Sequence, residues 1–284
     1  MNETRTDIEN RVFLISGGTS GVGKAIATGL ARLGAKVVII SRSAERGQAA
    51  LKDISEATGN NRGEWVAADL SLQSSIREVS DVYKRKYDQL HVLINACGAV
   101  YFKKELTAEG IDRMFAVNVH SHYLLTNQLL DILQESGPAR VITVSGNPRF
   151  MKNPIINFDD IQMEHQYNTM RATSQSLFAR TLFAFELAKR LEGTGVTSNA
   201  FYPGFVKSNL ARNAPWYLRV AAPLMNASAK QKCEIGVYLA SAKEIERANG
   251  VFFDDKKQIV PIHTKFEDGA GKKLWTLCEG LTNY

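Results

Sequence analysis

The chain has 284 residues, of which 44% are hydrophobic and 23% are charged, a composition typical of a soluble globular protein. A chain of this length can bury a core large enough to need no metal or disulfide for stability. The three cysteines, Cys97, Cys233 and Cys278, have neither metal-ligand nor redox-pair spacing. We therefore expect reduced thiols, no metal site and a cytoplasmic location.

Charge and hydropathy exclude several other classes of protein. The formal net charge of +6 favours anionic ligands, but Lys and Arg are scattered among Asp and Glu. Because no basic block with interleaved aromatic residues is present, we expect no nucleic-acid binding. The polar N-terminus is unlike a secretory signal, and no apolar run approaches the ~20 residues that span a bilayer.

Short β-branched runs alternate with longer segments of helical character along most of the chain. This alternation predicts an α/β protein with a Rossmann-type, doubly wound parallel sheet and helices on both faces. The predicted strands are Val12–Ile15, Val37–Ile40, Trp65–Ala67, Val92–Ile94, Val141–Val144 and Ser198–Phe201. The predicted helices are Val22–Leu33, Ala44–Ala57, Leu72–Tyr87, Thr107–Gln134 and Thr169–Leu191. No repeat or linker interrupts this pattern, so we predict one domain over residues 1–284.

The segment of about residues 203–230 has a different composition. It contains three prolines together with Trp216 and Tyr217. This mixture is typical of a mobile lid over a pocket, and the alternative is a helical hairpin that only covers the sheet.

A glycine-rich turn follows the first predicted strand and opens a helix. Gly17, Gly21 and Gly23 form the pattern G-x-x-x-G-x-G. Glycines allow a tight turn and a close approach to phosphate, and the helix N-terminus supplies unpaired N–H groups. Because the turn heads a βαβ unit, it predicts a dinucleotide site rather than a turn without a ligand. The expected contact residues are Gly17, Thr19, Ser20, Gly21, Val22 and Gly23.

The spacing of these glycines resembles the short-chain dehydrogenase/reductase family, in which a threonine usually stands at the place of Ser16. Two other segments, Leu93–Gly98 and Tyr202–Ser208, also resemble segments of this family. Its retinol-dehydrogenase-like branch is resembled by Leu106–Gly110, Val117–Asn118, Leu124–Thr126, Glu186–Leu191 and Gly193–Thr197. The resemblance implies adenine contacts from Asp69 and Leu70, and a cofactor role for Asn95. It also implies that Pro203, Gly204, Val206 and Ser208 lie beside the nicotinamide.

The end of the second strand bears on the choice of dinucleotide. An NAD site usually has a carboxylate there to accept the ribose hydroxyls. The residues that follow Ile40 are instead Ser41, Arg42 and Ser43. Because Arg42 can pair with a 2′-phosphate, we expect NADP(H) rather than NAD(H). The alternative is that Arg42 is a solvated turn residue.

The resemblance implies a catalytic serine, a Tyr-x-x-x-Lys pair and an asparagine. A nearby cation is needed because an unperturbed tyrosine, with a pKa of about 10, is a poor base at neutral pH. The helix expected to carry Tyr-x-x-x-Lys lacks this pair. Flanking segments that resemble the family place Thr173 at the tyrosine position and Leu177 at the lysine position. Gly146 falls at the serine position, and Asn118 alone is retained.

Several residues are candidates to replace the missing groups. Tyr167 and Arg171 form Tyr-x-x-x-Arg but lie six residues too early, so we expect Tyr167 to be a surface or pocket-wall aromatic. Ser145 precedes Gly146 and should point to the opposite face of its strand. The remaining candidates are Lys152, His120, His122 and His165 for proton transfer, and Thr173, Ser174 and Ser176 for substrate binding.

Two functions remain open. The first is an NADP(H)-dependent oxidoreductase with atypical catalytic groups, since positioning alone can be worth about 7–11 kcal/mol. The second is a redox-inactive descendant, such as a nucleotide sensor, a scaffold, or a cyclase or isomerase. Aromatic residues predict a lipophilic or ring-bearing ligand, and they are Tyr101, Phe102, Phe205, Trp216 and Tyr217. Family members often pair through the two long central helices, which would give a homodimer or homotetramer.

Overall fold

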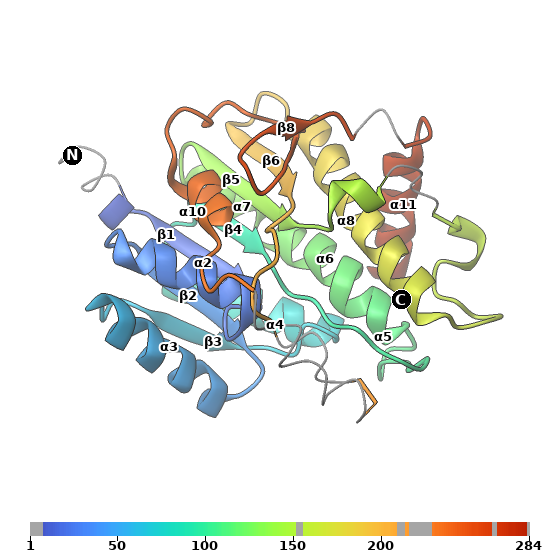
Figure 1. Cartoon of the computed structure of the whole chain (residues 1–284), viewed down its shortest axis with the longest axis horizontal. Coiled ribbons are helices and arrows are strands. Elements are labelled where there is room, and N and C mark those ends of the chain that lie inside the picture. Colours follow the sequence, from blue (N-terminus) through green and yellow to red (C-terminus); the bar gives the residue numbers. More distant parts are fainter. Residues whose placement is uncertain (1–7, 152–155, 209–213, 216–228, 263–265, 283–284) are drawn as a thin grey trace.

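The computed structural model describes residues 8–151, 156–208, 214–215, 229–262 and 266–282 (Figure 1). The strands of this part are β1 (Val12–Ser16), β2 (Lys36–Ser41), β3 (Glu64–Ala67), β4 (Val92–Asn95), β5 (Ala139–Val144), β6 (Val196–Phe201), β7 (Phe252–Phe253) and β8 (Ile259–Val260). They form one sheet of order β3-β2-β1-β4-β5-β6-β7-β8, in which only the β7–β8 pair is antiparallel. The predicted fold class is confirmed.

The helices are α2 (Gly21–Arg32), α3 (Ala44–Thr58), α4 (Gln73–Lys86), α5 (Arg113–Phe115), α6 (Ser121–Gln128), α7 (Leu130–Glu135), α8 (Thr169–Arg190), α10 (Glu234–Ser241) and α11 (Ala270–Thr282). A π-helical turn, η1 (Ala116–His120), precedes α6, and short 3-10 turns lie at η2 (Pro148–Phe150) and η3 (Phe158–Asp160). Strand residues alternate between two cores. Phe13 and Ile15 pack with the α2 and α10 layer, whereas Leu14 packs with the α4, α6 and α8 layer. The sheet is therefore buried on both faces, as its continuous apolar strands require.

The predicted helix Thr107–Gln134 is wrong at its beginning. The chain first forms a turn, in which the backbone N–H of Thr107 donates to the oxygen of Ile111 and Gly110 has φ +76°. Helix begins only after Asp112, whose carboxylate accepts from the backbone N–H of Phe115 at 2.9 Å. Glycine in the left-handed region and an N-capping aspartate explain the later start.

The C-terminal helix α11, which the periodicity did not predict, packs across α6 and α8. The Trp275 ring lies 4.9 Å from the Tyr123 ring and 6.2 Å from the Phe183 ring. The Arg190 guanidinium lies over Trp275 at 4.2 Å. Helix α11 therefore packs on α6 and α8, which belong to the two segments that were predicted to pair between subunits, and the homodimer or homotetramer stays a prediction.

The lid predicted at about residues 203–230 lies mostly outside the described residues. Its two described ends are joined, because the N–H of Lys207 donates to the oxygen of Lys230 at 2.9 Å and the N–H of Lys230 donates to the oxygen of Phe205 at 2.8 Å. Trp216 and Tyr217 are outside the described part. In the helices that are described, none has the length and hydropathy to cross a membrane.

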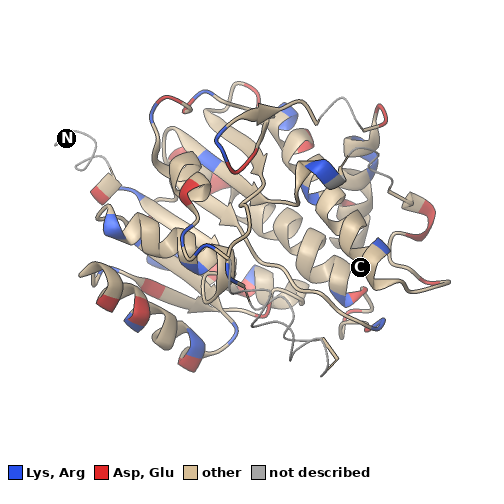
Figure 2. Cartoon of the chain, viewed as in Figure 1, with Lys and Arg blue, Asp and Glu red and all other residues tan. Residues whose placement is uncertain are grey.

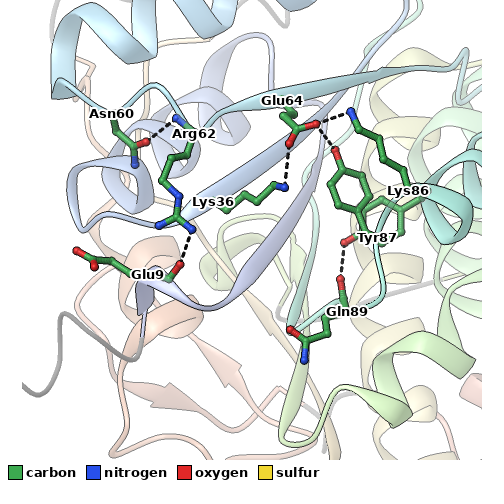
Figure 3. Close-up of polar contacts among 9 residues, drawn as sticks. Glu9, Lys36, Asn60, Arg62, Glu64, Lys86, Tyr87 and Gln89 are labelled. Atoms are coloured by element: carbon green, nitrogen blue, oxygen red, sulfur yellow. Dashed lines mark hydrogen bonds and ion pairs between the residues drawn. The ribbon is translucent and has the colours of Figure 1, made fainter.

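Lys and Arg positions alternate with Asp and Glu positions along the described helices and loops (Figure 2). One cluster joins β3 to β2 and α4 (Figure 3). Glu64 accepts a hydrogen bond from the Tyr87 hydroxyl at 2.8 Å and pairs with Lys36 at 2.9 Å and with Lys86. Burial raises the pKa of Glu64, but these three donors outweigh it and lower the pKa to about 2.

Replacement Glu64→Gln is expected to lower the free energy of unfolding by about 1–2 kcal/mol at pH 7. The folded pKa lies below the unfolded value near 4.3, so this stabilisation is present above pH ~4.5 and is lost as the pH falls toward 2. Urea denaturation from pH 7 to pH 3 measures the difference. Glu56→Gln is the control, because Glu56 pairs with Lys52 at 3.9 Å on an exposed surface. A Glu64 effect that is equal at pH 7 and pH 3 would contradict this assignment.

Candidate functional site

A cavity of about 500 Å³ opens at the carboxyl ends of the parallel strands. Doubly wound sheets bind ligands at this edge, where the strand order reverses between β1 and β4. The predicted site residues that line the cavity are Gly17, Thr19, Ser20, Gly21, Val22, Arg42, Asp69, Leu70, Asn118, Gly146, Thr173, Leu177, Pro203, Gly204, Val206 and Ser208. Folding therefore brings residues that are far apart in the sequence together around this one cavity.

The first turn of α2 opens onto this cavity without a side-chain cap. The N-cap residue Ser20 makes no capping hydrogen bond. By contrast, Ser43 caps α3 and Asn168 caps α8 by accepting from backbone N–H groups. The N–H groups at the start of α2 are thus left for an anionic ligand, which the positive end of the helix also favours.

Backbone elements approach closely around this turn. Gly17 has φ +69°, and a Cβ added there would lie 2.9 Å from the Cα of Cys97. A Cβ on Gly23 would lie 2.5 Å from the Gly17 oxygen. Such a turn, narrow and free of side chains, fits a pyrophosphate.

Two of the predicted cofactor contacts, Gly23 and Asn95, do not line the cavity. Gly23 instead lets α2 pack against the turn after β1. Asn95 is fully buried and donates to the Thr126 hydroxyl at 3.0 Å. Both residues support the turns around the site, and their direct contact with a cofactor stays a prediction.

Ser16, which stands where the family usually has threonine, ties two of the turns together. Its hydroxyl accepts from the N–H groups of Ala96 at 3.0 Å and Cys97 at 3.2 Å and donates to the oxygen of Ile94 at 3.3 Å. The end of β1 is thereby held against the end of β4, the two strands between which the cavity opens.

Two arginines and one carboxylate lie at the β2–β3 end of the cavity. Arg42 and Arg46 both line it, and the sequence had indicated only Arg42. Arg46 lies in the first turn of α3, four residues after Arg42. This spacing was the signal in the sequence that both arginines could line the same site. Asp69 is the one acidic residue among the described residues of the cavity wall, and its Oδ1 accepts from the N–H and hydroxyl of Ser71.

At the β4–β5 end, Leu177 occupies space beside Gly146. A Cβ on Gly146 would lie 2.8 Å from the Leu177 Cδ1. Thr173 lies one turn earlier on α8 and donates to the oxygen of Thr169 at 2.7 Å. The Asn118 side chain forms two hydrogen bonds with the backbone of Ala99: its Oδ1 accepts from the N–H at 2.8 Å, and its Nδ2 donates to the oxygen at 2.9 Å. These contacts bring the four positions assigned to catalysis together, but show no acid among them.

The other candidates for proton transfer lie away from the cavity wall. Tyr167 donates to the oxygen of Tyr101 at 2.9 Å, and burial raises its pKa. Burial lowers the pKa of His120 to about 4 and that of His122 well below its usual value, so both rings are neutral. His165 is exposed, and Lys152 lies outside the described residues.

Of the hydroxyl candidates, Ser176 donates to the oxygen of Ala172, and neither Ser174 nor Ser176 lines the cavity. The Ser145 hydroxyl bonds to the oxygen of Leu177 at 3.0 Å and to the Thr181 hydroxyl at 2.7 Å. Two phenols remain on the described cavity wall, those of Tyr101 and Tyr202. No three His, Cys, Asp or Glu side chains gather into a metal-binding group within the described ranges.

Arg180 also lines the cavity and was missed in the sequence. Its side chain is buried, and it donates to the oxygens of Asn118 at 2.6 Å and Cys97 at 2.9 Å. A charged residue within the apolar run Phe178–Leu182 of a long helix was the available signal, because ionised side chains are seldom buried without a reason.

The fold and this site define a dinucleotide-binding α/β protein. The sequence pattern of the family described as short chain dehydrogenase matches residues 11–216. Mouse retinol dehydrogenase 12 is 35% identical over 284 residues, covering 98% of this chain and 88% of that protein. Human polyprenol dehydrogenase is 32% identical over 277 residues, covering 94% and 83%. The chain belongs to the short-chain dehydrogenase family, whose members are oxidoreductases.

Solved structures agree with this assignment. An uncharacterized protein from Mycobacterium paratuberculosis has a TM-score of 0.74 and 28% identity, covering 96% of this chain and 94% of that chain. The RhlG/NADP complex of Pseudomonas aeruginosa has a TM-score of 0.65 and 24% identity, covering 86% and 94%. The second similarity establishes the fold alone.

Proposed function

We propose that the protein is an NADP(H)-binding short-chain dehydrogenase that acts on a lipophilic carbonyl or alcohol with atypical catalytic groups. One observation supports this most strongly: a single cavity joins an uncapped, glycine-lined helix start to a pair of arginines and to an apolar end. An NADP(H) molecule bound here would have its 2′-phosphate at the arginines, its pyrophosphate at the helix start and its nicotinamide at the apolar end. We also propose a cytoplasmic location, and its only support is that the number and spacing of the cysteines are typical of reduced thiols.

The choice of NADP(H) rests on the β2–β3 end of the cavity. Arg42 and Arg46 lie where a ribose 2′-phosphate would be received, and guanidinium groups bind phosphate through charge-assisted hydrogen bonds. The carboxylate Asp69 follows β3 rather than β2, so it does not take the place of the acidic residue of NAD sites.

The apolar end supports a lipophilic substrate. Its wall includes Val100, Val117, Leu177 and Phe205. Relatives at 32–35% identity are named for polyprenol and retinol, both lipophilic alcohols. A pocket of this size and character suits a chain-like or ring-bearing ligand.

In the oxidoreductase reading, the bound dinucleotide would supply or accept a hydride. The residues of this chain position the reactants, because Leu177 and Gly146 form an apolar floor and Asn118 holds the Ala99 segment. The substrate oxygen still requires a proton, and a cavity phenol is the group left to give it. A missing acid costs about 10²- to 10⁴-fold in rate, so turnover is expected to be slow.

A redox-inactive function is the second candidate. The observation that favours it is the apolar contact between position 146 and Leu177, which fills space that a hydroxyl and a cation would need. Such a protein would bind the dinucleotide as a sensor, or use the cavity for a step such as isomerisation.

Arg42→Ala with Arg46→Ala is expected to weaken NADPH binding by about 10- to 100-fold and to leave NADH binding nearly unchanged, because NADH has no 2′-phosphate. Fluorescence titration of each nucleotide measures the two constants. Arg32→Ala on α2 is the control, since Arg32 does not line this cavity. Equal losses for both nucleotides would contradict the NADP(H) assignment.

The same protein then distinguishes the two candidate functions. Wild-type protein saturated with NADPH is mixed with a panel of lipophilic aldehydes, ketones and enones, and NADPH consumption is followed. Turnover of any of them supports the oxidoreductase. Tight NADPH binding without turnover supports the redox-inactive function, and absence of binding contradicts both.

A further inference from the structure

Arg180 lies between the ends of β4 and β5, at the apolar end of the cavity. Its Nε donates to the Asn118 oxygen at 2.6 Å, and its two terminal nitrogens donate to the oxygens of Cys97 at 2.9 Å and Val144 at 3.5 Å. These three carbonyls come from the π-helical turn η1, the turn after β4 and the last residue of β5. The side chain is 6% exposed and forms part of the cavity wall.

No carboxylate neutralises this guanidinium in the part of the chain that the structure describes. The undescribed internal segments, residues 152–155, 209–213, 216–228 and 263–265, contain no Asp or Glu. Burial lowers the pKa of Arg180 to about 10, so the side chain stays ionised at neutral pH. His122 donates its Nε2–H to the same Cys97 oxygen, at 2.9 Å, and burial lowers its pKa well below the usual value. The Cys97 side chain is the electrostatic neighbour that raises the pKa of Arg180 against the effect of burial.

Arg140 shows what a structural buried arginine looks like in this fold. It is 4% exposed and donates to the oxygens of Leu239 and Ala242, both at 2.8 Å. Unlike Arg180, it has acidic neighbours, since Glu244 and Glu246 raise its pKa against the effect of burial. It also lies away from the cavity. The three carbonyl oxygens around Arg180 accept its hydrogen bonds but carry no full negative charge, so they do not neutralise the buried guanidinium.

We propose that Arg180 makes the cavity selective for the reduced form of the dinucleotide. The nicotinamide ring carries a positive charge when oxidised and none when reduced, so a buried cation beside it opposes the oxidised form. Arg42 and Arg46 receive the adenosine half at the β2–β3 end. A dinucleotide bound across the point where the strand order reverses therefore has its nicotinamide half over the ends of β4 and β5. Arg180 donates hydrogen bonds to the turn after β4 and to the last residue of β5.

This inference rests on the dinucleotide binding of the proposed function, but it holds whether or not the site transfers hydride. An oxidoreductase would load with NADPH from a mixed pool. A redox-inactive protein would respond to the ratio of NADPH to NADP⁺. In either case the selectivity comes from charge rather than from shape, since the two forms differ little in size.

The test is the ratio of the dissociation constants for NADP⁺ and NADPH, measured by fluorescence titration for NADPH and by calorimetry for NADP⁺. We expect wild-type protein to bind NADPH at least about tenfold more tightly. Arg180→Gln and Arg180→Met, which remove the charge, should lower this ratio about tenfold, and Arg180→Lys should retain it. Arg140→Gln is the matched control, expected to lower stability without changing the ratio.

The outcomes distinguish an electrostatic role of Arg180 from a structural role. A structural role of Arg180 would weaken both forms equally and leave the ratio unchanged in the neutral variants, which overturns the inference. If neither neutral variant folds, a wild-type ratio near one overturns it, and a ratio of ten or more that Arg180→Lys preserves supports it. Failure of wild-type protein to bind either nucleotide contradicts the proposed function instead.

Discussion

The triple variant Gly146→Ser, Thr173→Tyr and Leu177→Lys is expected to reduce carbonyl substrates with NADPH about 10²- to 10⁴-fold faster than wild-type protein. The three positions lie together on the cavity wall, on the turn after β5 and on one face of α8. A phenol one helical turn from an ammonium group gains a lower pKa, which is what proton transfer at neutral pH needs. Steady-state NADPH oxidation with a lipophilic aldehyde measures the gain.

The three changes must be made together. Because a Cβ at position 146 would lie 2.8 Å from the Leu177 Cδ1, Gly146→Ser alone is expected to lower the free energy of unfolding by about 1–3 kcal/mol. Leu177→Lys removes the branched methyl groups and should recover most of this loss, which a double-mutant cycle by urea denaturation detects. A variant with Thr173→Phe in place of Thr173→Tyr is the control for the phenol. If that control is as active as the triple variant, the assignment of position 173 is wrong.

The variant Gly23→Ala is expected to bind NADPH at least about 100-fold more weakly, and its free energy of unfolding is expected to be lower by about 2–4 kcal/mol. Its methyl group would lie 2.5 Å from the backbone oxygen of Gly17, so the start of α2 must move away from the turn after β1. Moving the helix start displaces the N–H groups and the positive helix end on which an anionic ligand depends. A main-chain obstacle cannot be relieved by a side-chain rotation.

NADPH titration and urea denaturation of the same preparation measure the two losses of Gly23→Ala. Gly280→Ala is the control, because α11 leaves open space around Gly280 and alanine is the better helix former. The control is expected to be neutral or slightly stabilising. Wild-type affinity for NADPH in Gly23→Ala would show that the dinucleotide does not bind at this turn.

Local patterns explain which elements could be predicted. Apolar runs such as Val37–Ile40 lie within β2, and the helix predicted from Thr169 ends within one residue of α8. The prediction failed near Thr107, where a positive-φ glycine and an aspartate cap postpone the helix, although the hydrophobic pattern continues. It also missed the strands β7 and β8, which have 2 residues each and are too short to leave a periodic signal.

The amino-acid sequence by itself determined the fold class, the glycine turn, the arginine at the end of β2 and the lack of Tyr-x-x-x-Lys in the segment that forms α8, because each follows from patterns of neighbouring residues. Only the tertiary structure decided that Leu177 fills the space beside Gly146 and that α11 covers α6 and α8. It also decided that the buried Arg180 donates to the carbonyl oxygens of residues 97, 118 and 144. Contacts between residues this far apart depend on how the helices cross the sheet, and the energy of a buried charge depends on which groups those contacts bring beside it.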